Sequence, residues 1–220
     1  MAEFKFTDAH RQRFLALHSA LLCDSMDRMN LPLQVVSHDI RPMYAGATIV
    51  GRALTLLQTA VHRRPSEPYK VLFEAFRQIR RHDVLVITAG ERKSGVWGGL
   101  LSTAAQARGA AGCVIDGLTR DIAEIESIEF PVYAAGESPI DSEGRSEAVE
   151  WGTPVECGGA RVSQGDVVFA DAMGIVVIPA EIMEEVLRRA EEKQRGETNV
   201  RGILASGADL GDTFKKYGIL

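Results

Sequence analysis

An arginine and an aspartate stand side by side at Arg120 and Asp121, directly after an apolar stretch of the chain. A guanidinium presents a planar fork of donors that fits a carboxylate or an enolate. A carboxylate is a hard oxygen ligand of the kind that Mg²⁺ and Mn²⁺ prefer. The pair therefore indicates a site that binds a small anion beside a divalent metal. A surface ion pair, or a cap by Asp121 on a helix over residues 122–125, would explain the same residues without any chemistry.

A second chemical feature is the run Gly98-Gly99-Leu100-Leu101, which opens a predicted helix. The first backbone N–H groups of a helix have no acceptor within the helix, so they can bind a carboxylate or an oxyanion. Glycine at this point removes side chains that would obstruct a ligand. The run lacks the GxxxxGK[ST] pattern, so it is not a P-loop. A purely structural turn remains the alternative interpretation.

One β-loop-α-β unit is expected to position both features. The pattern predicts a strand over 84–88, a glycine-rich loop over 90–99, a helix over 100–108 and a strand over 114–116. Such a crossover joins two parallel strands with a right-handed connection. Ligands of parallel α/β units sit beyond the carboxyl ends of the strands. The loops over 90–99 and 117–121 should therefore face each other if the two strands are neighbours.

The remaining pattern predicts an α/β protein with mixed strands, arranged as one domain over residues 1–220. Its other elements are a first helix capped by Thr7, a strand over 47–61, a helix from Pro68 to about residue 80, a strand over 131–135, a polar loop over 136–148, a hairpin over 161–179 and an amphipathic helix over 181–195. The tail from Gly196 is polar and glycine-spaced, and we expect it to dock on a neighbouring subunit.

The composition argues against several classes of protein. A net charge of −5 is unlike that of a nucleic-acid binder, and no apolar run approaches the ~20 residues that span a membrane. Three widely spaced cysteines fit reduced thiols, and no targeting segment is visible, so a cytoplasmic protein is expected. Lys93 lies in a charged loop and is a poor Schiff-base residue. His62 is a weak candidate for a substrate contact.

Two longer motifs carry a family resemblance. Residues 97–121 contain the pattern GxVIDGxxRD, and residues 165–179 contain GDxVxADxxGxVVIP. Shorter matches lie at 23–27, 51–55 and 130–132. Together these segments resemble the RraA-like family, which includes the 4-hydroxy-4-methyl-2-oxoglutarate/4-carboxy-4-hydroxy-2-oxoadipate aldolases. The resemblance covers most of the chain.

The resemblance implies a three-layer β/β/α swivelling-type fold with a mixed sheet, and a homotrimer that is sometimes doubled to a homohexamer. It implies that Gly98 to Leu101 bind the substrate through backbone N–H groups. Arg120 would contact the keto or enolate oxygen of the substrate. Asp121 would hold Mg²⁺ or Mn²⁺, mostly through waters. Glu197 is the best match to a glutamate that a neighbouring subunit's tail adds to the metal shell.

One residue departs from the pattern of the aldolases. They have an aspartate at the position of Gly99, which holds a water that transfers protons. Without that aspartate, decarboxylation should exceed aldol cleavage unless another group, such as His62 or Glu91, supplies the base. The regulator branch of the family, which binds and inhibits a ribonuclease, lacks the metal aspartate, whereas this chain retains Asp121.

The residues and the resemblance together predict a class II, metal-dependent aldolase or decarboxylase. It would cleave a C–C bond of a small 2-oxo acid through a pyruvate enolate. Two alternatives stay open: a non-catalytic protein-binding regulator of a ribonuclease, and a related lyase or decarboxylase acting on a sugar-derived keto acid. A methyltransferase is not favoured, because no GxGxG turn follows an early strand.

Overall fold

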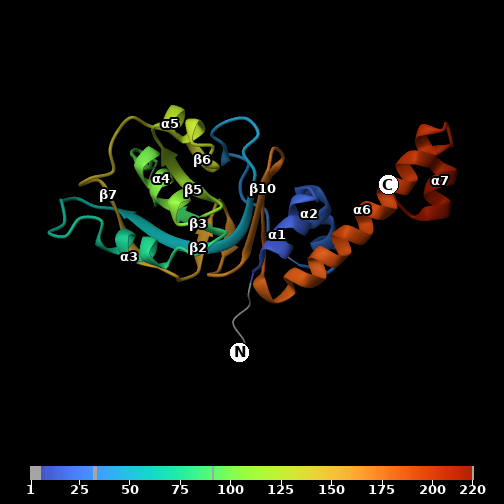
Figure 1. Ribbon diagram of the computed structural model, residues 1–220, viewed down its shortest axis with the longest axis horizontal. Coiled ribbons are helices and arrows are strands. Elements are labelled where there is room, and N and C mark those ends of the chain that lie inside the picture. Colours follow the sequence, from blue (N-terminus) through green and yellow to red (C-terminus); the bar gives the residue numbers. More distant parts are fainter. Residues whose placement is uncertain (1–5, 32–33, 91, 220) are drawn as a thin grey trace.

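A mixed β-sheet forms the centre of the computed structural model, which describes residues 6–31, 34–90 and 92–219 (Figure 1). The strands are β1 (Arg41–Pro42), β2 (Ile49–Ala60), β3 (Asp83–Thr88), β4 (Gly95–Trp97), β5 (Gly112–Thr119), β6 (Val132–Glu137), β7 (Ser146–Trp151), β8 (Val155–Cys157), β9 (Ala160–Val162), β10 (Val167–Asp171) and β11 (Gly174–Ile178). Their order in the main sheet is β1-β6-β5-β3-β2-β10-β11, with β4 paired to β5 and β7 paired to β2. Parallel pairing of β2, β3, β5 and β6 confirms the predicted crossover unit.

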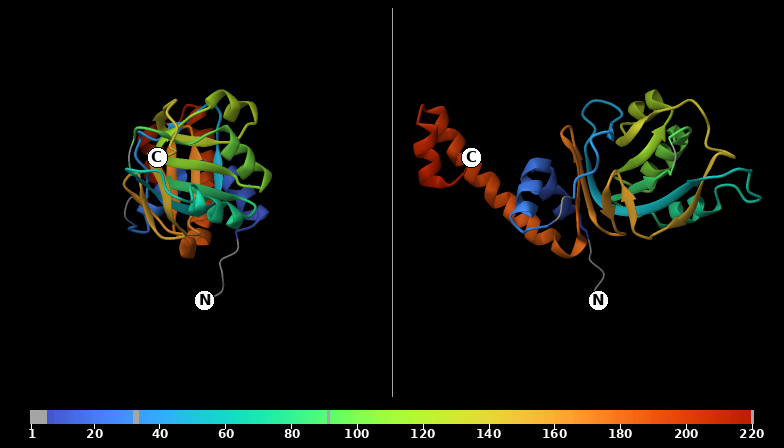
Figure 2. Two further views of the ribbon diagram at one scale, coloured as in Figure 1. Left: turned by 90° about the vertical axis from the view of Figure 1, so that its left-hand side faces the viewer. Right: turned by 180° about the vertical axis from the view of Figure 1, so that it is seen from behind.

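Alternating side chains of the parallel strands build two cores on opposite faces of the sheet. Leu85 and Ile87 of β3 pack with the helices, whereas Val84 and Val86 pack with the β8–β9 hairpin. The helices on the first face are α3 (Lys70–Gln78), α4 (Gly99–Ala107) and α5 (Ile122–Ser127). Helices, sheet and hairpin therefore form the expected three layers (Figure 2).

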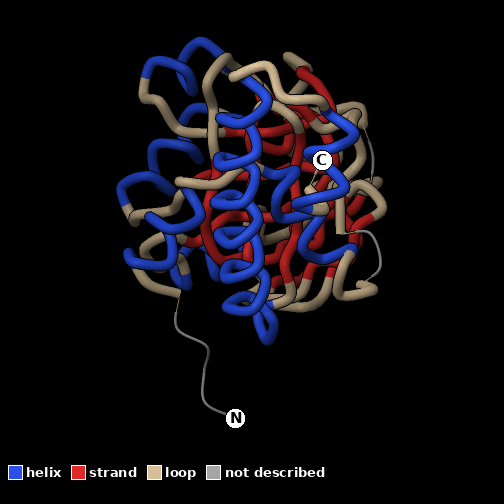
Figure 3. The backbone as a smooth tube through the Cα atoms, turned by 90° about the vertical axis from the view of Figure 1, so that its right-hand side faces the viewer, coloured by secondary structure: helices blue, strands red, loops and turns tan. Residues whose placement is uncertain are grey.

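A third core joins the two ends of the chain beyond β10 and β11. It contains Phe14 of α1 (Asp8–Leu15), Leu22 of α2 (Ser19–Asp27) and Leu187 of α6 (Met183–Ala205). The predicted cap on α1 is confirmed, because the Thr7 side chain accepts a hydrogen bond from the His10 N–H. A 3₁₀ turn, η1 (Ala180–Ile182), leads into α6. From there α6 runs away from the sheet and carries α7 (Leu210–Tyr217) at its far end (Figures 1 and 3).

The predicted end of the last amphipathic helix at residue 195 is wrong. The helix continues through Gly196 to Ala205 before α7 begins. Gly196 lies where the chain end packs back on α6, since a Cβ atom there would lie 2.6 Å from Ile219 Cδ1. The glycine at which the predicted tail began is therefore a point where Ile219, which follows α7, packs closely on α6. We call residues 196–219 the C-terminal arm.

The predicted hairpin over 161–179 is wrong in its first half. The paired strands are β10 and β11, with Val167 opposite Ile178, whereas Val162 of β9 pairs with Val155 of β8. The Asp166 carboxylate accepts hydrogen bonds from the N–H groups of Ser163 and Ala180. These bonds close the turn between the small hairpin and the main sheet, so the chain changes layer there.

Two segments near the expected site also differ from their predicted boundaries. The strand predicted over 114–116 extends to Thr119, which leaves Arg120 and Asp121 as the only predicted loop residues beyond β5. The polar loop predicted over 136–148 gives way to β7 at Ser146, which pairs with Ala60 of β2. Within the described ranges, none of the helices combines the length and apolar character needed to cross a membrane.

Candidate active site

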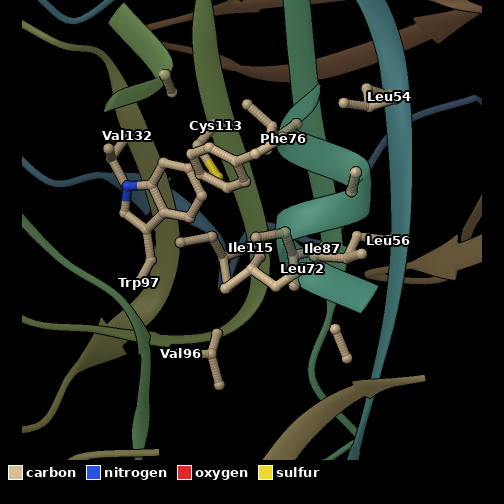
Figure 4. Packing of buried hydrophobic residues seen from close by; sticks show 14 of the residues in the cluster. Leu54, Leu56, Leu72, Phe76, Ile87, Val96, Trp97, Cys113, Ile115 and Val132 are labelled. Carbon is tan, nitrogen blue, oxygen red and sulfur yellow. The ribbon is translucent and has the colours of Figure 1, made fainter. Parts of the chain in front are cut away.

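The Arg120–Asp121 pair lies at the carboxyl end of β5, beside the short parallel strand β4. The Arg120 N–H donates to the Trp97 carbonyl at 3.0 Å, which ties the end of β5 to β4. Trp97 is fixed in turn, because its indole N–H donates to Ser102 Oγ at 2.7 Å and its ring packs against Phe76 (Figure 4). The predicted convergence of the two loops is therefore observed.

Glycines of the predicted substrate-binding run make room for the two charged side chains. A Cβ atom at Gly98 would lie 2.5 Å from Asp121 Oδ2 and 3.2 Å from Arg120 Cγ. A Cβ atom at Gly95 would lie 3.3 Å from Arg120 Cβ. A side chain at either position would displace Arg120 or Asp121, so steric contact explains why both positions are glycine.

The Asp121 carboxylate faces the N-terminus of α4. Asp121 adopts a left-handed backbone conformation with φ of 58°, which aspartate tolerates better than most residues. Its Oδ2 accepts a hydrogen bond from the Gly99 N–H at 3.1 Å. The alternative in which Asp121 caps the following helix is wrong, because α5 has no side-chain cap bond. The strained conformation therefore directs the carboxylate toward α4.

The Arg120 guanidinium is held only loosely by acidic neighbours. Its Nε lies 3.4 Å from Asp121 Oδ2, and one terminal nitrogen lies 3.4 Å from Asp141 Oδ2. Its side chain is 36% exposed and that of Asp121 is 34% exposed. These long contacts leave donors of the fork free to bind an incoming anion.

A pocket of about 360 Å³ opens over this pair, a volume typical of small-molecule sites. The lining residues are Gln58, Tyr69, Leu72, Phe73, Gly95, Val96, Trp97, Gly98, Leu100, Leu101, Arg120, Asp121, Asp141, Ser142, Ser146 and Glu147. Of the predicted substrate-binding run, Gly98, Leu100 and Leu101 line the pocket. Gly99 stands behind them with its N–H turned to Asp121.

Sequence reasoning missed two groups of lining residues. Phe73 comes from α3 and Tyr69 from its N-cap position, and this helix was expected to have no role in the site. Asp141 and Glu147 come from the segment expected to be a polar loop. Buried Ser146 and Ala148 alternate with half-buried Glu147 and exposed Val149, as in a half-buried strand, and this period of two could have placed β7 at the site.

The position of Gly99 is filled by a different acidic side chain. A Cβ atom at Gly99 would lie 2.1 Å from Glu124 Oε2 and 3.1 Å from Glu124 Cβ. The Glu124 carboxylate, which comes from α5, therefore occupies the space into which a side chain at residue 99 would extend. His62 lines a separate hollow with Arg63 and Arg64, and Glu91 lies outside the described residues.

The structure does not bring Glu197 to Asp121 within one chain. Glu197 lies in α6, at the opposite end of the molecule from α4 and α5 (Figure 1). It pairs with Lys193 at 3.4 Å, and Lys193 also pairs with Asp24 of α2.

The other candidate nucleophiles lie in unreactive surroundings. Lys93 is exposed, and its carbonyl accepts a hydrogen bond from the Ser138 hydroxyl. Cys113 and Cys157 are buried free thiols, and burial raises the pKa of both. Neither thiol has thiolate character at neutral pH, so both act as core residues.

Comparisons with known proteins agree with the resemblance carried by the motifs. The chain is 27% identical over 207 residues to protein DlpA of Legionella pneumophila, which covers 94% of this chain and 33% of DlpA. It therefore spans a third of that relative's length. It is 29% identical over 183 residues to a protein of Halalkalibacterium halodurans named "Putative 4-hydroxy-4-methyl-2-oxoglutarate aldolase", covering 83% of this chain and 82% of the relative.

Proteins of known structure share this fold. The crystal structure of Streptomyces coelicolor RraAS2, described as an unusual member of the RNase ES inhibitor RraA protein family, superposes with a TM-score of 0.79. That match covers 90% of this chain and 98% of RraAS2 at 24% identity, so it shows the fold alone. The family model described as RraA-like, Aldolase/RraA, matches residues 19–177. The chain belongs to the RraA-like family.

Proposed function

We propose that this protein is a divalent-metal-dependent lyase that cleaves a C–C bond of a 2-oxo acid through a pyruvate enolate. The observation that carries the proposal is the convergence of Arg120, Asp121 and the N-terminus of α4 on one pocket. The relative named as an aldolase supports the same reaction class. Aldol cleavage and oxaloacetate decarboxylation pass through the same enolate, so one site can perform both.

The chain's own residues would bind and stabilise the anionic parts of the reaction. The free donors of Arg120 would bind the keto oxygen and hold the negative charge that grows on it as the C–C bond breaks. The N–H groups of Leu100 and Leu101, in the first turn of α4, have no acceptor within the helix and would bind the substrate carboxylate. The buried Trp97 and Leu72 exclude water from the inner side of the pocket.

With Asp121 as its protein ligand in this pocket, a bound Mg²⁺ or Mn²⁺ would keep most of its water ligands and would not be enclosed by protein side chains. Among the described residues, no group of three histidine, cysteine or acidic side chains could hold a metal. The Asp121 carboxylate is exposed at the pocket, and Mg²⁺ commonly binds through one or two carboxylates while keeping several waters. When bound, such an ion would act as a Lewis acid toward the keto oxygen.

The proposal extends to the assembly. We propose a homotrimer or homohexamer in which the C-terminal arm docks on a neighbouring subunit and brings Glu197 near that neighbour's Asp121. The arm presents the exposed apolar side chains of Leu210 and Phe214, as expected for a docking element.

The experiment that tests the proposed function is a screen of 2-oxo acids for pyruvate release with Mg²⁺ or Mn²⁺ present. The expected result is enzyme-dependent pyruvate formation from oxaloacetate or from a 4-hydroxy-2-oxo acid. The alternative, a non-catalytic regulator, predicts capture of a ribonuclease in a pull-down and no metal-dependent turnover of any 2-oxo acid. A sugar-derived keto acid as the preferred substrate would keep the reaction class and change the substrate.

A further inference from the structure

One wall of the pocket is apolar and comes from two helices. It consists of Leu72 and Phe73 of α3, Tyr69 at the N-cap position of α3, and Leu100 and Leu101 of α4. The Tyr69 and Phe73 rings lie 6.0 Å apart at a tilt of 45°. Phe73 is 51% exposed and Leu100 is 85% exposed, so this wall offers apolar surface that a ligand could cover.

The pocket also has acidic lining residues. Asp141 and Glu147 line it, and Arg120 is the sole basic residue among the described lining residues. Burial raises the pKa of Tyr69, and the negative charge of Asp141 and Glu143 adds to that rise. A substrate that binds at Arg120 and at the ion that Asp121 would hold therefore finds no further basic side chain in this lining for a carboxylate carried on C4.

The basic residues of the adjoining hollow have acidic neighbours. Arg63 and Arg64 line that hollow, and Arg64 is paired with Glu143. Glu147 lines both hollows, so an acidic side chain borders both of them. A tail that carries a carboxylate would meet either like charge or the apolar wall, and both are unfavourable.

We propose that the pocket accepts 4-hydroxy-2-oxo acids whose C4 substituent is an uncharged aryl or branched alkyl group rather than a second carboxylate. This inference rests on the proposed function. In the cleavage, the C3–C4 bond breaks and its electron pair stays on C3 as the enolate. The C4 hydroxyl loses its proton to water, and C4 becomes the carbonyl of an apolar aldehyde or ketone. Protonation of the enolate at C3 then gives pyruvate.

The test compares three substrates of the full-length protein with Mg²⁺ present. They are 4-hydroxy-4-phenyl-2-oxobutanoate, 4-hydroxy-4-methyl-2-oxoglutarate, which carries a carboxylate on C4, and oxaloacetate, whose C4 is itself the carboxylate that leaves as CO₂. We expect kcat/KM for the phenyl substrate to exceed that for the dicarboxylate on the order of 10–100-fold, the range that hydrophobic pockets achieve. Equal values, or preference for the dicarboxylate, would overturn the inference.

Two variants of the wall sharpen the test. Phe73→Ala should lower kcat/KM for the phenyl substrate on the order of 10-fold more than for oxaloacetate, because it removes apolar contact with the tail alone. Phe73→Arg should shift the preference toward the dicarboxylate. Met173→Ala is the matched control, because Met173 is an exposed apolar residue in the β10–β11 turn.

The outcomes separate this inference from the proposed function. Oxaloacetate turnover with no preference for the phenyl tail would refute the inference and leave the lyase intact. No turnover of any of the three substrates would refute both. If Phe73→Arg changes the oligomeric state in solution and leaves the substrate preference unchanged, the wall is a contact between subunits and the inference is wrong.

Discussion

The carboxyl end of β5 and the middle of α6 each carry a carboxylate predicted to serve the metal, and their surroundings differ. Asp121 has an arginine neighbour, a helix N-terminus and a pocket, all supplied by one chain. Glu197 has Lys193 as its ion-pair partner and lies on an arm that leaves the body of the molecule. The first region is a site that a single subunit can build. The second becomes part of a site only if another subunit lies against it.

The largest effect is expected from removing the charge of Asp121. Asp121→Asn should reduce oxaloacetate decarboxylation to the rate that the free metal ion gives in solution, because the metal loses its one carboxylate ligand from the body of the chain. The measurement is steady-state pyruvate formation across a range of Mg²⁺ concentrations. Glu126→Gln is the control, because Glu126 is an exposed acidic residue on α5, the helix that follows Asp121. Equal losses in both variants would refute a special role for Asp121.

The next largest effect is expected at Arg120. Arg120→Ala should lower kcat on the order of 10²–10³-fold and change KM less, because the charge on the enolate oxygen is greatest after cleavage has begun. Arg120→Lys should restore only part of kcat, since an ammonium cannot reproduce the planar fork. Steady-state kinetics with oxaloacetate measure both values. A kcat for Arg120→Ala within a few-fold of wild type would rule out this role.

A smaller effect is expected at Gly99. The wild type should decarboxylate oxaloacetate measurably and cleave 4-hydroxy-4-methyl-2-oxoglutarate weakly, since retro-aldol cleavage requires a base for the substrate hydroxyl and decarboxylation does not. Gly99→Asp alone forces Glu124 to move, because the new Cβ would overlap its carboxylate. The double variant Gly99→Asp/Glu124→Ala removes that overlap. We expect it to raise the ratio of aldol cleavage to decarboxylation by about 10-fold or more, toward the ~10²–10⁴ that positioned acid–base groups supply.

The comparison that checks this prediction includes the wild type, both single variants and the double variant, with thermal unfolding to confirm that each folds. If the wild type cleaves the aldol as fast as it decarboxylates oxaloacetate, the lack of an aspartate at residue 99 does not leave the site without a base. In that case Glu124 or another group supplies the base.

The smallest effect is expected in the C-terminal arm. Glu197→Gln should raise the Mg²⁺ concentration needed for half-maximal activity by about 10-fold, the lower end of the loss typical of groups that hold metal-bound waters. Glu192→Gln is the control, because Glu192 is an exposed glutamate on the same helix that pairs with Arg188. Equilibrium sedimentation should show a trimer or hexamer. A fully active monomer at assay concentration would contradict the shared site.

Much of the central sheet could be predicted from the sequence, because its signals are local. Buried strands such as β3 are continuous apolar runs bounded by polar residues, and Gly109 ends the α4 segment where expected. The Arg120–Asp121 pair was found because its charges follow directly on an apolar strand. Its exact orientation depends on Gly95 and Gly98, whose steric role emerges only when β4 lies beside β5.

The parts that sequence reasoning missed depend on contacts between distant segments. Residues such as Tyr69 and Glu147 reach the pocket because α3 and β7 both pack over the end of β2. The Glu124 carboxylate beside Gly99 is a contact between two helices, and no spacing in the sequence reveals it. Helix continuity through Gly196 was missed for the same reason, since Ile219 is the residue that packs there.

The proposed metal-dependent lyase activity is tested most directly by measuring how pyruvate formation depends on a divalent metal. The purified protein is assayed with oxaloacetate, then with excess EDTA, then with Mg²⁺ or Mn²⁺ restored, alongside Arg120→Ala and a metal-only blank. We expect enzyme-dependent pyruvate formation that EDTA abolishes, that either ion restores, and that Arg120→Ala largely lacks. Full activity in EDTA, or a substrate adduct trapped by borohydride on a lysine, would contradict it.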